Sequence, residues 1–356
     1  MSLTDKLRKN TTIKDTEILA VSKFFTKKDM IATPIPAINV ALSGRLDGGL
    51  TPGLTMWAGP SKHFKTAFSL LMAKSYMDKY PDAAMLFYDS EFGTPQAYFN
   101  SFGIDLNRVV HTPITDVEQL KFDIMKQLEG IARGEHIIII VDSIGNLASK
   151  KEVEDALEGK SVGDMSRAKQ IKSLFRMVTP HLTMKDIPMV VVNHTYKTLE
   201  LYSKDVVGGG TGSYYSADNI FILGRQQEKE GTEVVGYNFI INVEKSRHVR
   251  EKSKIPVSVT FDGGISTWSG LLEMALESGH VVKPSNGWYA RVNDDGVVDD
   301  TKFRLKDTDT REFWSPIIQS KSFRDWVKGT YQVASGAIMA DNSIDEEFKA
   351  ISNSEE

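Results

Sequence analysis

The sequence predicts an α/β fold with a twisted, largely parallel sheet. Three short apolar runs, at residues 83–88, 136–141 and 188–192, have the composition of strands that are buried on both faces of such a sheet. Two longer stretches with helical spacing, 117–132 and 165–178, lie between them. Because strands that alternate with helices are typical of a doubly wound sheet, we expect helices on both faces of this one.

Residues 54–72, which organise this fold, have the pattern of a strand, a polar turn and a helix. An apolar run at 54–58 enters the turn, and Lys65 and Thr66 open a segment with apolar residues at helical spacing. Unpaired N–H groups and the positive end of the helix dipole make such a helix start a site for polyphosphate. We therefore expect the turn to bind the polyphosphate of a nucleotide through the residues Gly59, Pro60, Ser61, Lys62, His63, Phe64, Lys65 and Thr66.

One position departs from the pattern G-x-x-x-x-G-K-[ST] of phosphate-binding loops. Lys65 is expected to reach the β- and γ-phosphates, and the Thr66 hydroxyl to bind Mg²⁺. The chain has Phe64 where the pattern has glycine, the residue that tolerates backbone conformations other residues avoid. Two alternatives follow: either Phe64 keeps a negative φ in a working loop, or the match is accidental and the segment is a basic surface turn.

Polar groups follow the three buried strands directly. Glu91 comes after the first strand, Asp142 after the second, and His194 after the third. In open α/β sheets, ligands bind at the carboxyl ends of the strands. We expect Asp142 to hold hydrated Mg²⁺, Glu91 to activate a water molecule against the γ-phosphate, and His194 to sense that phosphate. The alternative for each of them is a hydrogen-bonded group that caps a strand end.

Two long segments, 148–165 and 196–212, follow the second and third of these strands. Segments of such length without a core of their own are usually functional or disordered. In neither segment do lysines outnumber acidic residues, so charge alone leaves open whether the segments bind DNA. Tyr202 either stacks on a base or packs within its loop. The candidate DNA-binding residues in and beside the segments are Lys150, Lys151, Arg167, Lys197, Tyr202, Lys204, Gly209 and Gly210.

Two cations, Lys245 and Arg247, follow a further predicted strand at 237–243. Because they are separated by one residue, they project to the same side of an extended chain. They are either solvated surface charges or ligands of phosphate.

The composition limits the classes of protein to which the chain can belong. With 356 residues, of which 41% are hydrophobic and 25% charged, the chain can form one large domain or one domain and a smaller one. It has no cysteine, which excludes a disulfide scaffold, a cysteine nucleophile and a thiolate zinc site. No run approaches the roughly 18 apolar residues of a membrane span, and the polar N-terminus is unlike a signal peptide, so we expect a cytoplasmic protein without a membrane partner. The formal net charge of −4 predicts that any DNA contact is local.

Four regions are expected along the chain. Residues 1–33 form an N-terminal arm, in which apolar positions between 18 and 25 fit an amphipathic helix that packs on its own core or on a neighbouring subunit. A linker with two prolines, which exclude a helix there, leads into an ATPase core at 34–267. Residues 268–340 form a small α+β domain, whose last helix lies within 313–332, and residues 341–356 form an acidic, mobile tail.

In this order, the motifs resemble those of the RecA-type recombinases, and most of all the UvsX-like branch of T-even-like bacteriophages. GPSKHFKT is similar to the Walker A loop of the family, LFYDSEFG carries its catalytic glutamate, and IIIIVDSIGNLASKKE resembles Walker B with the start of the first DNA-binding loop. VVNHTY and GGGTG resemble the borders of the second loop, VEKSR the pair of cations, and VVKPSNGWYAR the small C-terminal domain. The phage branch is also expected to lack glycine at the position of Phe64.

The resemblance implies a DNA-dependent ATPase that forms a helical filament on single-stranded DNA. Such a protein pairs that strand with double-stranded DNA and exchanges strands in recombination, repair and recombination-dependent replication. It uses ATP and Mg²⁺, and Lys245 and Arg247 reach the nucleotide of the neighbouring protomer. Expected partners are a recombination mediator and a single-stranded DNA-binding protein. A hexameric helicase of the same fold and a nucleotide-switched regulator stay open as alternatives.

Overall fold

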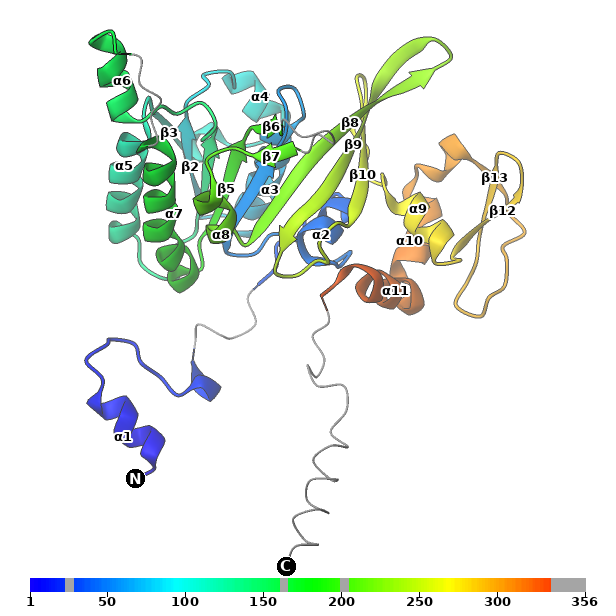
Figure 1. Cartoon of the computed structure of the whole chain (residues 1–356). Coiled ribbons are helices and arrows are strands. Elements are labelled where there is room, and N and C mark those ends of the chain that lie inside the picture. The colour runs from blue at the N-terminus through cyan, green and yellow to red at the C-terminus, as the bar shows by residue number, and fades with distance from the viewer. Residues whose placement is uncertain (23–28, 161–165, 199–204, 334–356) are drawn as a thin grey trace, which may run out of the picture.

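A nine-stranded sheet forms the centre of the molecule (Figure 1). The computed structural model describes residues 1–22, 29–160, 166–198 and 205–333. In spatial order the strands are β11 (Gly264–Ile265), β10 (Lys254–Thr260), β9 (Glu233–Ser246), β8 (Asn219–Glu230), β1 (Gly53–Ala58), β5 (Pro188–Asn193), β4 (Ile137–Asp142), β2 (Ala84–Asp89) and β3 (Val109–Pro113).

The predicted α/β fold with a largely parallel sheet is confirmed. The strands from β8 to β3 pair in parallel, whereas β9, β10 and β11 continue the sheet in antiparallel pairs. The three apolar runs form β2, β4 and β5, which lie inside the parallel part. Their continuous hydrophobicity follows from this position, since helices cover both faces there.

Two layers of helices enclose the sheet (Figure 1). One apolar core lies between the sheet and the helices α2 (Pro36–Ser43), α3 (Lys65–Lys79) and α4 (Gln96–Ser101). The second core lies on the opposite face, under α5 (Val117–Gly130) and α7 (Ser166–Lys185), with α8 (Thr211–Ser216) beside α7. Successive residues of β1 alternate between these cores, with Trp57 in the first and Met56 in the second. The alternation fixes the register of β1, because a shift by one residue would exchange the two faces.

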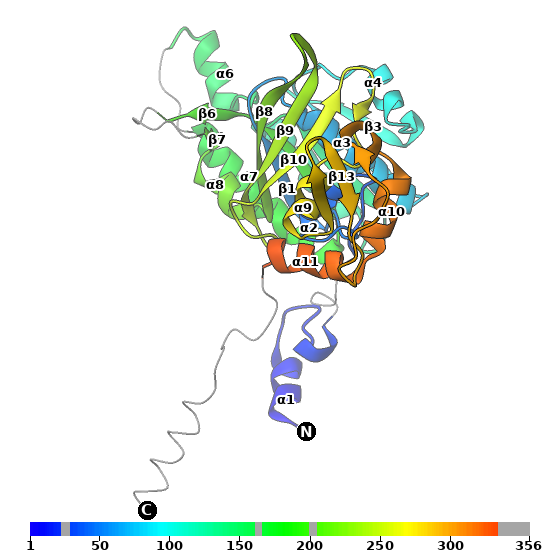
Figure 2. The same cartoon turned by 90° about the vertical axis from the view of Figure 1, so that its right-hand side faces the viewer.

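A three-stranded antiparallel sheet follows the main sheet in the chain and faces the viewer in Figure 2. Its strands are β12 (Val281–Ser285), β13 (Trp288–Arg291) and β14 (Phe303–Arg304), accompanied by α9 (Leu271–Glu277), a 3₁₀ turn at Leu305–Thr308, α10 (Arg311–Gln319) and α11 (Lys321–Tyr331). Side chains from α9, α10 and α11 enter the first apolar core. Beyond α11, the Gln332 amide donates to the Ser43 carbonyl of α2, which ties this region to the main sheet.

The linker with two prolines contains a helix, so the prediction that the prolines exclude one was wrong. Helix α2 begins at Pro36, so one of the two prolines occupies the first turn of the helix. Proline is compatible with that position because the first N–H groups of a helix have no partner within the helix, and its fixed φ suits the helix.

The predicted amphipathic helix between residues 18 and 25 was also wrong in the part that the structure describes. Only Leu19–Val21 forms a short 3₁₀ turn, and residues 23–28 lie outside the described part. The arm instead carries α1 (Leu3–Asn10), which begins at a capping box formed by Ser2 and Asp5. This helix buries none of its residues and lies apart from the sheet in both views (Figures 1 and 2).

The two long charged segments contain secondary structure of their own. The first holds α6 (Lys150–Leu157) and the second holds a small hairpin of β6 (Thr195–Lys197) and β7 (Asp205–Val207). A further 3₁₀ turn, Leu106–Arg108, precedes β3. The single helix expected near the C-terminus is divided at Ser320 into α10 and α11. Among the described residues, no helix has the length and apolar character needed to cross a membrane.

Candidate nucleotide-binding site

The carboxyl ends of four adjacent strands, β1, β5, β4 and β2, meet at one edge of the sheet. A cleft of about 280 Å³ lies there. Its lining includes Ser61, Lys62, His63, Phe64, Lys65, Thr66, Glu91, Tyr98, Asp142 and His194. The sheet therefore brings together the predicted phosphate loop and the three predicted strand-end groups, which are up to 133 positions apart in the chain (194 − 61).

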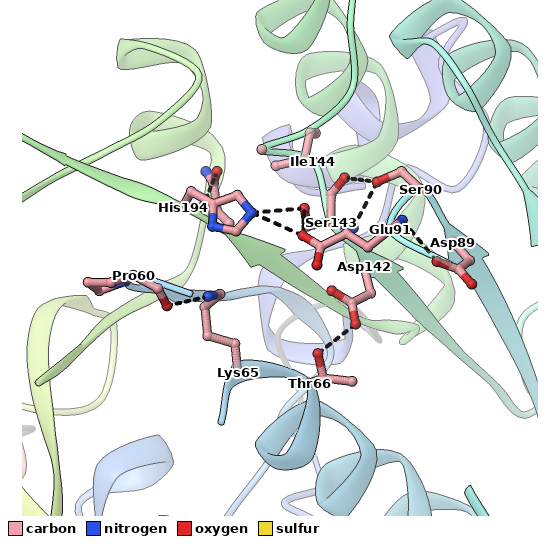
Figure 3. Close-up of polar contacts among 12 residues, drawn as sticks. Pro60, Lys65, Thr66, Asp89, Ser90, Glu91, Asp142, Ser143, Ile144 and His194 are labelled. Atoms are coloured by element: carbon pink, nitrogen blue, oxygen red, sulfur yellow. Dashed lines mark hydrogen bonds and ion pairs between the residues drawn. The ribbon is translucent and has the colours of Figure 1, made fainter. Parts of the chain in front are cut away.

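Lys65 is held in the first turn of α3 and is only 6% exposed. Its Nζ donates a 2.7 Å hydrogen bond to the carbonyl of Pro60, so the side chain folds back over the loop (Figure 3). Burial lowers the pKa of Lys65, while the carboxylates of Glu91 and Asp142 act in the opposite direction. A buried ammonium with one carbonyl partner is ready to exchange that partner for phosphate oxygens.

Thr66 and Asp142 lie where a magnesium ion would be held. The Thr66 hydroxyl donates to Oδ2 of Asp142 at 2.6 Å, and Oδ1 of Asp142 is buried without a hydrogen-bond partner. Burial raises the pKa of Asp142 to about 6. An orphaned carboxylate oxygen beside a hydroxyl is a donor set suited to hydrated Mg²⁺, which prefers oxygen ligands and keeps several waters. The residues present therefore fit the predicted metal.

Glu91 is held by two donors at the end of the cleft. Its Oε1 accepts from the Ser143 hydroxyl at 2.6 Å and from Nε2 of His194 at 3.0 Å (Figure 3). The hydrogen bond from His194, and after it that from Ser143, lowers the pKa of Glu91, so the carboxylate is ionised near neutral pH. An ionised carboxylate can accept a proton from an attacking water.

Ser143 was missed in the sequence, although it directly follows Asp142. Besides its contact with Glu91, its backbone N–H donates to the Ser90 hydroxyl at 3.0 Å, and that hydroxyl donates to the Ser143 carbonyl at 2.6 Å. These bonds join the ends of β2 and β4 and hold Glu91 and Asp142 side by side. Tyr98 of α4 was missed as well; it is partly buried in the cleft lining, where burial raises its pKa.

Phe64 does not keep the negative φ that the first of its two alternatives required. Its backbone has φ 59° and ψ 17°, the left-handed conformation that glycine adopts readily. A negative φ was therefore the wrong expectation, and the loop has the geometry of the glycine pattern without the glycine. The Phe64 ring packs at 4.9 Å from the ring of Phe239 in β9 and near Phe68 of α3. This aromatic contact offsets a backbone conformation that costs roughly 1–2 kcal/mol for a residue with a Cβ.

The rest of the loop is supported from outside it. Arg225 of β8 donates to the carbonyl of Lys62 at 3.1 Å, and Lys62 also has a positive φ, of 60°. His63 hydrogen-bonds the Ser61 carbonyl through Nδ1, and burial lowers the pKa of its ring.

Lys245 and Arg247 lie far from the cleft of their own chain. Ser246 pairs with Asn219 of β8, and Asn219 pairs with Thr55 of β1. Thr55 precedes the first loop residue by four positions, or roughly 13 Å at 3.3 Å per strand residue. The Lys245 ammonium donates to the carbonyl of Tyr214 at 2.8 Å.

Arg247 forms an ion pair with Asp218, and its side chain is still 69% exposed. Asp218 is itself fixed, because its Oδ2 accepts the N–H of Leu54 at 2.8 Å. The two cations therefore cannot serve the nucleotide cleft of the chain that carries them.

The candidate DNA-binding residues of the first segment differ in what holds them. Lys150 and Lys151 open α6, which buries none of its residues, and Lys151 forms an ion pair with Asp155. Arg167 of α7 instead donates three hydrogen bonds of 2.6–3.0 Å to the carbonyls of Leu147, Ile144 and Gly145. Its guanidinium therefore fixes the backbone that follows Asp142.

The second segment is attached directly to the candidate γ-phosphate sensor. The N–H of Gly208 donates to the His194 carbonyl at 2.9 Å, and the Asn193 amide donates to the Gly208 carbonyl at 2.9 Å. Gly209 and Gly210 follow with φ of 89° and 73°. Lys197 is exposed at the end of β6, whereas Tyr202 and Lys204 lie outside the described residues.

Comparison with known proteins gives two matches to family models. A model described as "RecA N-terminal domain" matches residues 14–266, and a model described as "Bacteriophage T4, Recombination and repair protein, C-terminal domain" matches residues 268–327. The chain belongs to the RecA family.

The chain is similar to several known proteins to different degrees. The "Recombination and repair protein" of Enterobacteria phage T4 is 52% identical over 357 aligned residues, which cover 99% of this chain and 91% of that protein. "Protein RecA" of Synechococcus sp. (strain CC9902) is 26% identical over 270 residues, or 75% of this chain and 69% of that protein. A solved structure titled "Crystal structure of the RadB recombinase" aligns with 66% of this chain and 98% of its own, with a TM-score of 0.48 at 19% identity. The family match confirms the resemblance expected from the motifs, including its phage branch.

Proposed function

We propose that this RecA-family protein is a DNA-dependent ATPase, which assembles into a helical filament on single-stranded DNA and pairs that strand with homologous double-stranded DNA. In this proposal the phosphate loop binds ATP, with Lys65 on the β- and γ-phosphates. Thr66 and Asp142 would hold Mg²⁺, which neutralises charge on the phosphates when it is bound. Glu91 orients and deprotonates the attacking water, and His194 exchanges its contact with Glu91 for the γ-phosphate.

The position of Lys245 and Arg247 is the main observation in support of the proposed filament. In this proposal phosphoryl transfer uses both the cleft and the two cations, yet they lie on different surfaces of the chain. A site completed by a second copy then requires a head-to-tail contact between unlike surfaces, and such contacts close into rings or continue as open helices. The cations of one protomer would neutralise the charge that develops on the γ-phosphate bound by the next.

The two segments after β4 and β5 are the proposed DNA-binding loops. Each starts next to a group of the nucleotide cleft: the first follows Asp142, and the second is hydrogen-bonded to His194 through Gly208. This connection supports a coupling in which bound ATP and bound DNA stabilise the same arrangement of the loops. In a DNA-pairing filament, base pairing reads the sequence, so the protein needs only backbone contacts. This is compatible with a net charge of −4.

The test is ATP hydrolysis with and without single-stranded DNA at two salt concentrations, with electron microscopy of the same samples. We expect stimulation by DNA that weakens at high salt, because phosphate contacts release counterions, and open helical filaments on the DNA. Turnover indifferent to DNA would favour the nucleotide-switched regulator, and closed rings would favour the helicase.

A further inference from the structure

The turn that carries Glu91 is organised by a buried carboxylate at the end of β2. Asp89 is only 4% exposed. Its Oδ1 accepts the backbone N–H of Glu91 at 3.0 Å and that of Phe92 at 2.8 Å. Figure 3 shows Asp89 beneath this turn, on the side away from His194. The carboxylate therefore determines the path of the backbone from which the Glu91 side chain projects.

The turn needs this support because its backbone is strained. Phe92 has a φ of 55° and is 62% exposed, so packing of its own side chain does little to hold that conformation. A residue with a Cβ pays roughly 1–2 kcal/mol in the left-handed region. The two hydrogen bonds to Asp89 are charge-assisted, and they fix the turn in place of packing.

The other oxygen of Asp89 is held by a histidine on the neighbouring strand. His111 of β3 contacts Oδ2 through Nε2 at 3.1 Å, while its ring stacks on Phe87 at 5.9 Å. A carboxylate offers only acceptors, so Nε2 carries the hydrogen and donates. With Oδ2 occupied in this way, rotation of the Asp89 carboxylate is restricted and Oδ1 stays on the two N–H groups.

We propose that His111 is a positioning residue for Glu91, which it orients through the carboxylate of Asp89. The inference rests on the proposed function, because it concerns the role given to Glu91 in ATP hydrolysis. His111 touches neither the phosphate loop nor Asp142 in the structure, and it acts only on the direction of the water-activating carboxylate. The binding of ATP is then independent of His111, whereas the rate of the chemical step depends on it.

The variant that tests the proposal is His111→Phe in the full chain. Phenylalanine keeps a ring to stack on Phe87 but removes the donor. For hydrolysis stimulated by single-stranded DNA, we expect kcat to fall about 10-fold while KM for ATP changes less than about twofold, because only the chemical step loses an interaction. His111→Gln, whose amide returns a donor near the position of Nε2, is expected to restore most of the loss.

The chain offers a matched control in His136. Its Nδ1 contacts the carboxylate of Asp82 at 2.9 Å and its ring stacks on Tyr80, but it lies at the amino end of β4, away from Glu91. His136→Phe therefore removes a histidine–aspartate contact of the same kind, and we expect it to leave kcat unchanged. Thermal unfolding of all variants reports any general loss of structure.

A double variant separates positioning from a purely structural role. If His111 acts through Glu91, then His111→Phe added to Glu91→Gln lowers kcat no further than Glu91→Gln alone. A further loss in the double variant, an unchanged kcat for His111→Phe, or a failure of His111→Gln to recover activity would each overturn the proposal. Unchanged turnover for Glu91→Gln itself would instead overturn the ATPase role of Glu91.

Discussion

The hydroxyl of Thr66 and the Oδ2 atom of Asp142, from residues 76 positions apart in the chain, are joined by a hydrogen bond of 2.6 Å. The second oxygen of Asp142, Oδ1, is buried without a partner. Buried polar atoms are nearly always paired, so this oxygen has capacity to accept a ligand. The phosphate loop and the end of β4 therefore place a hydroxyl and a carboxylate side by side, an arrangement that fits the Mg²⁺ proposed to bind with ATP.

Asp142→Asn tests this magnesium site. An amide offers a single weaker oxygen to the metal, so we expect DNA-stimulated kcat to fall at least ~100-fold and the Mg²⁺ requirement to shift to higher concentration. The measurement is turnover across a Mg²⁺ titration. Asp123→Asn is the control, because Asp123 accepts from the buried Tyr88 hydroxyl at 2.7 Å on the outer helix α5. Parent-like turnover of Asp142→Asn at low Mg²⁺ would contradict the assignment.

The left-handed backbone conformation of Phe64 leads us to expect an unusual order of stability for two substitutions at this position. Both Phe64→Ala and Phe64→Gly remove the ring that packs on Phe239, but only glycine adopts φ 59° without strain. We therefore expect the glycine variant to be more stable than the alanine variant by about 1 kcal/mol, the reverse of the usual order in helices. Denaturant unfolding measures the difference, and KM for ATP is expected to rise more in the alanine variant. Equal stability of the two would show that the left-handed conformation is not required.

Because Gly145 has no side chain, His194 can lie very close to the chain that follows β4. A Cβ at Gly145 would lie 2.3 Å from Cδ2 of His194 and 3.2 Å from its backbone nitrogen. We expect Gly145→Ala to displace the imidazole from Glu91 and to reduce DNA stimulation of ATP hydrolysis as much as His194→Ala does. Gly130→Ala is the control, since a Cβ there meets no atom within 4 Å. Full DNA stimulation in Gly145→Ala would mean that the contact between His194 and Glu91 plays no part in coupling.

Arg247→Ala is expected to separate stability from activity. The Arg247 side chain is 69% exposed, and the buried carboxylate of Asp218 keeps the N–H of Leu54 as a donor when Arg247 is removed. We therefore expect the thermal midpoint to change by only a few degrees. Turnover stimulated by DNA is expected to fall at least ~100-fold, because a cation on the transferred phosphoryl group is worth 10³–10⁵ in related enzymes. An Arg247→Ala variant that keeps its thermal midpoint and hydrolyses ATP normally would contradict a role at the neighbouring site.

Most of the central sheet could be predicted from the sequence because burial on both faces leaves a local signal. The runs at 83–88, 136–141 and 188–192 needed no knowledge of their neighbours, and the groups at their ends followed from the rule for open sheets. Helix α2 was missed because two prolines favour a turn locally, although one of them is well suited to a helix start.

The parts of the site that were missed depend on contacts between distant residues. Phe64 is held in its conformation by Phe239, which lies 175 positions later (239 − 64), and nothing near Phe64 in the sequence predicts this. Arg167 looks like a free cation in a charged segment, yet three backbone carbonyls hold its guanidinium. His111 has no motif around it and becomes informative only when β3 pairs with β2.

The most direct test of a nucleotide site shared between protomers is a mixing experiment with two inactive proteins. Lys65→Ala lacks the phosphate-loop lysine, and Arg247→Ala lacks the cation that we propose to reach the nucleotide of the neighbour. In a random equimolar filament, about a quarter of the interfaces combine an intact Lys65 with an intact Arg247, because the head-to-tail contact joins different surfaces.

We therefore predict that equimolar mixtures on single-stranded DNA recover up to about a quarter of parental ATP turnover, while each variant alone stays inactive. Co-sedimentation of differently labelled variants with the DNA verifies that mixed filaments have formed. Mixed filaments with no more turnover than the separate proteins would contradict a site completed by the neighbouring protomer.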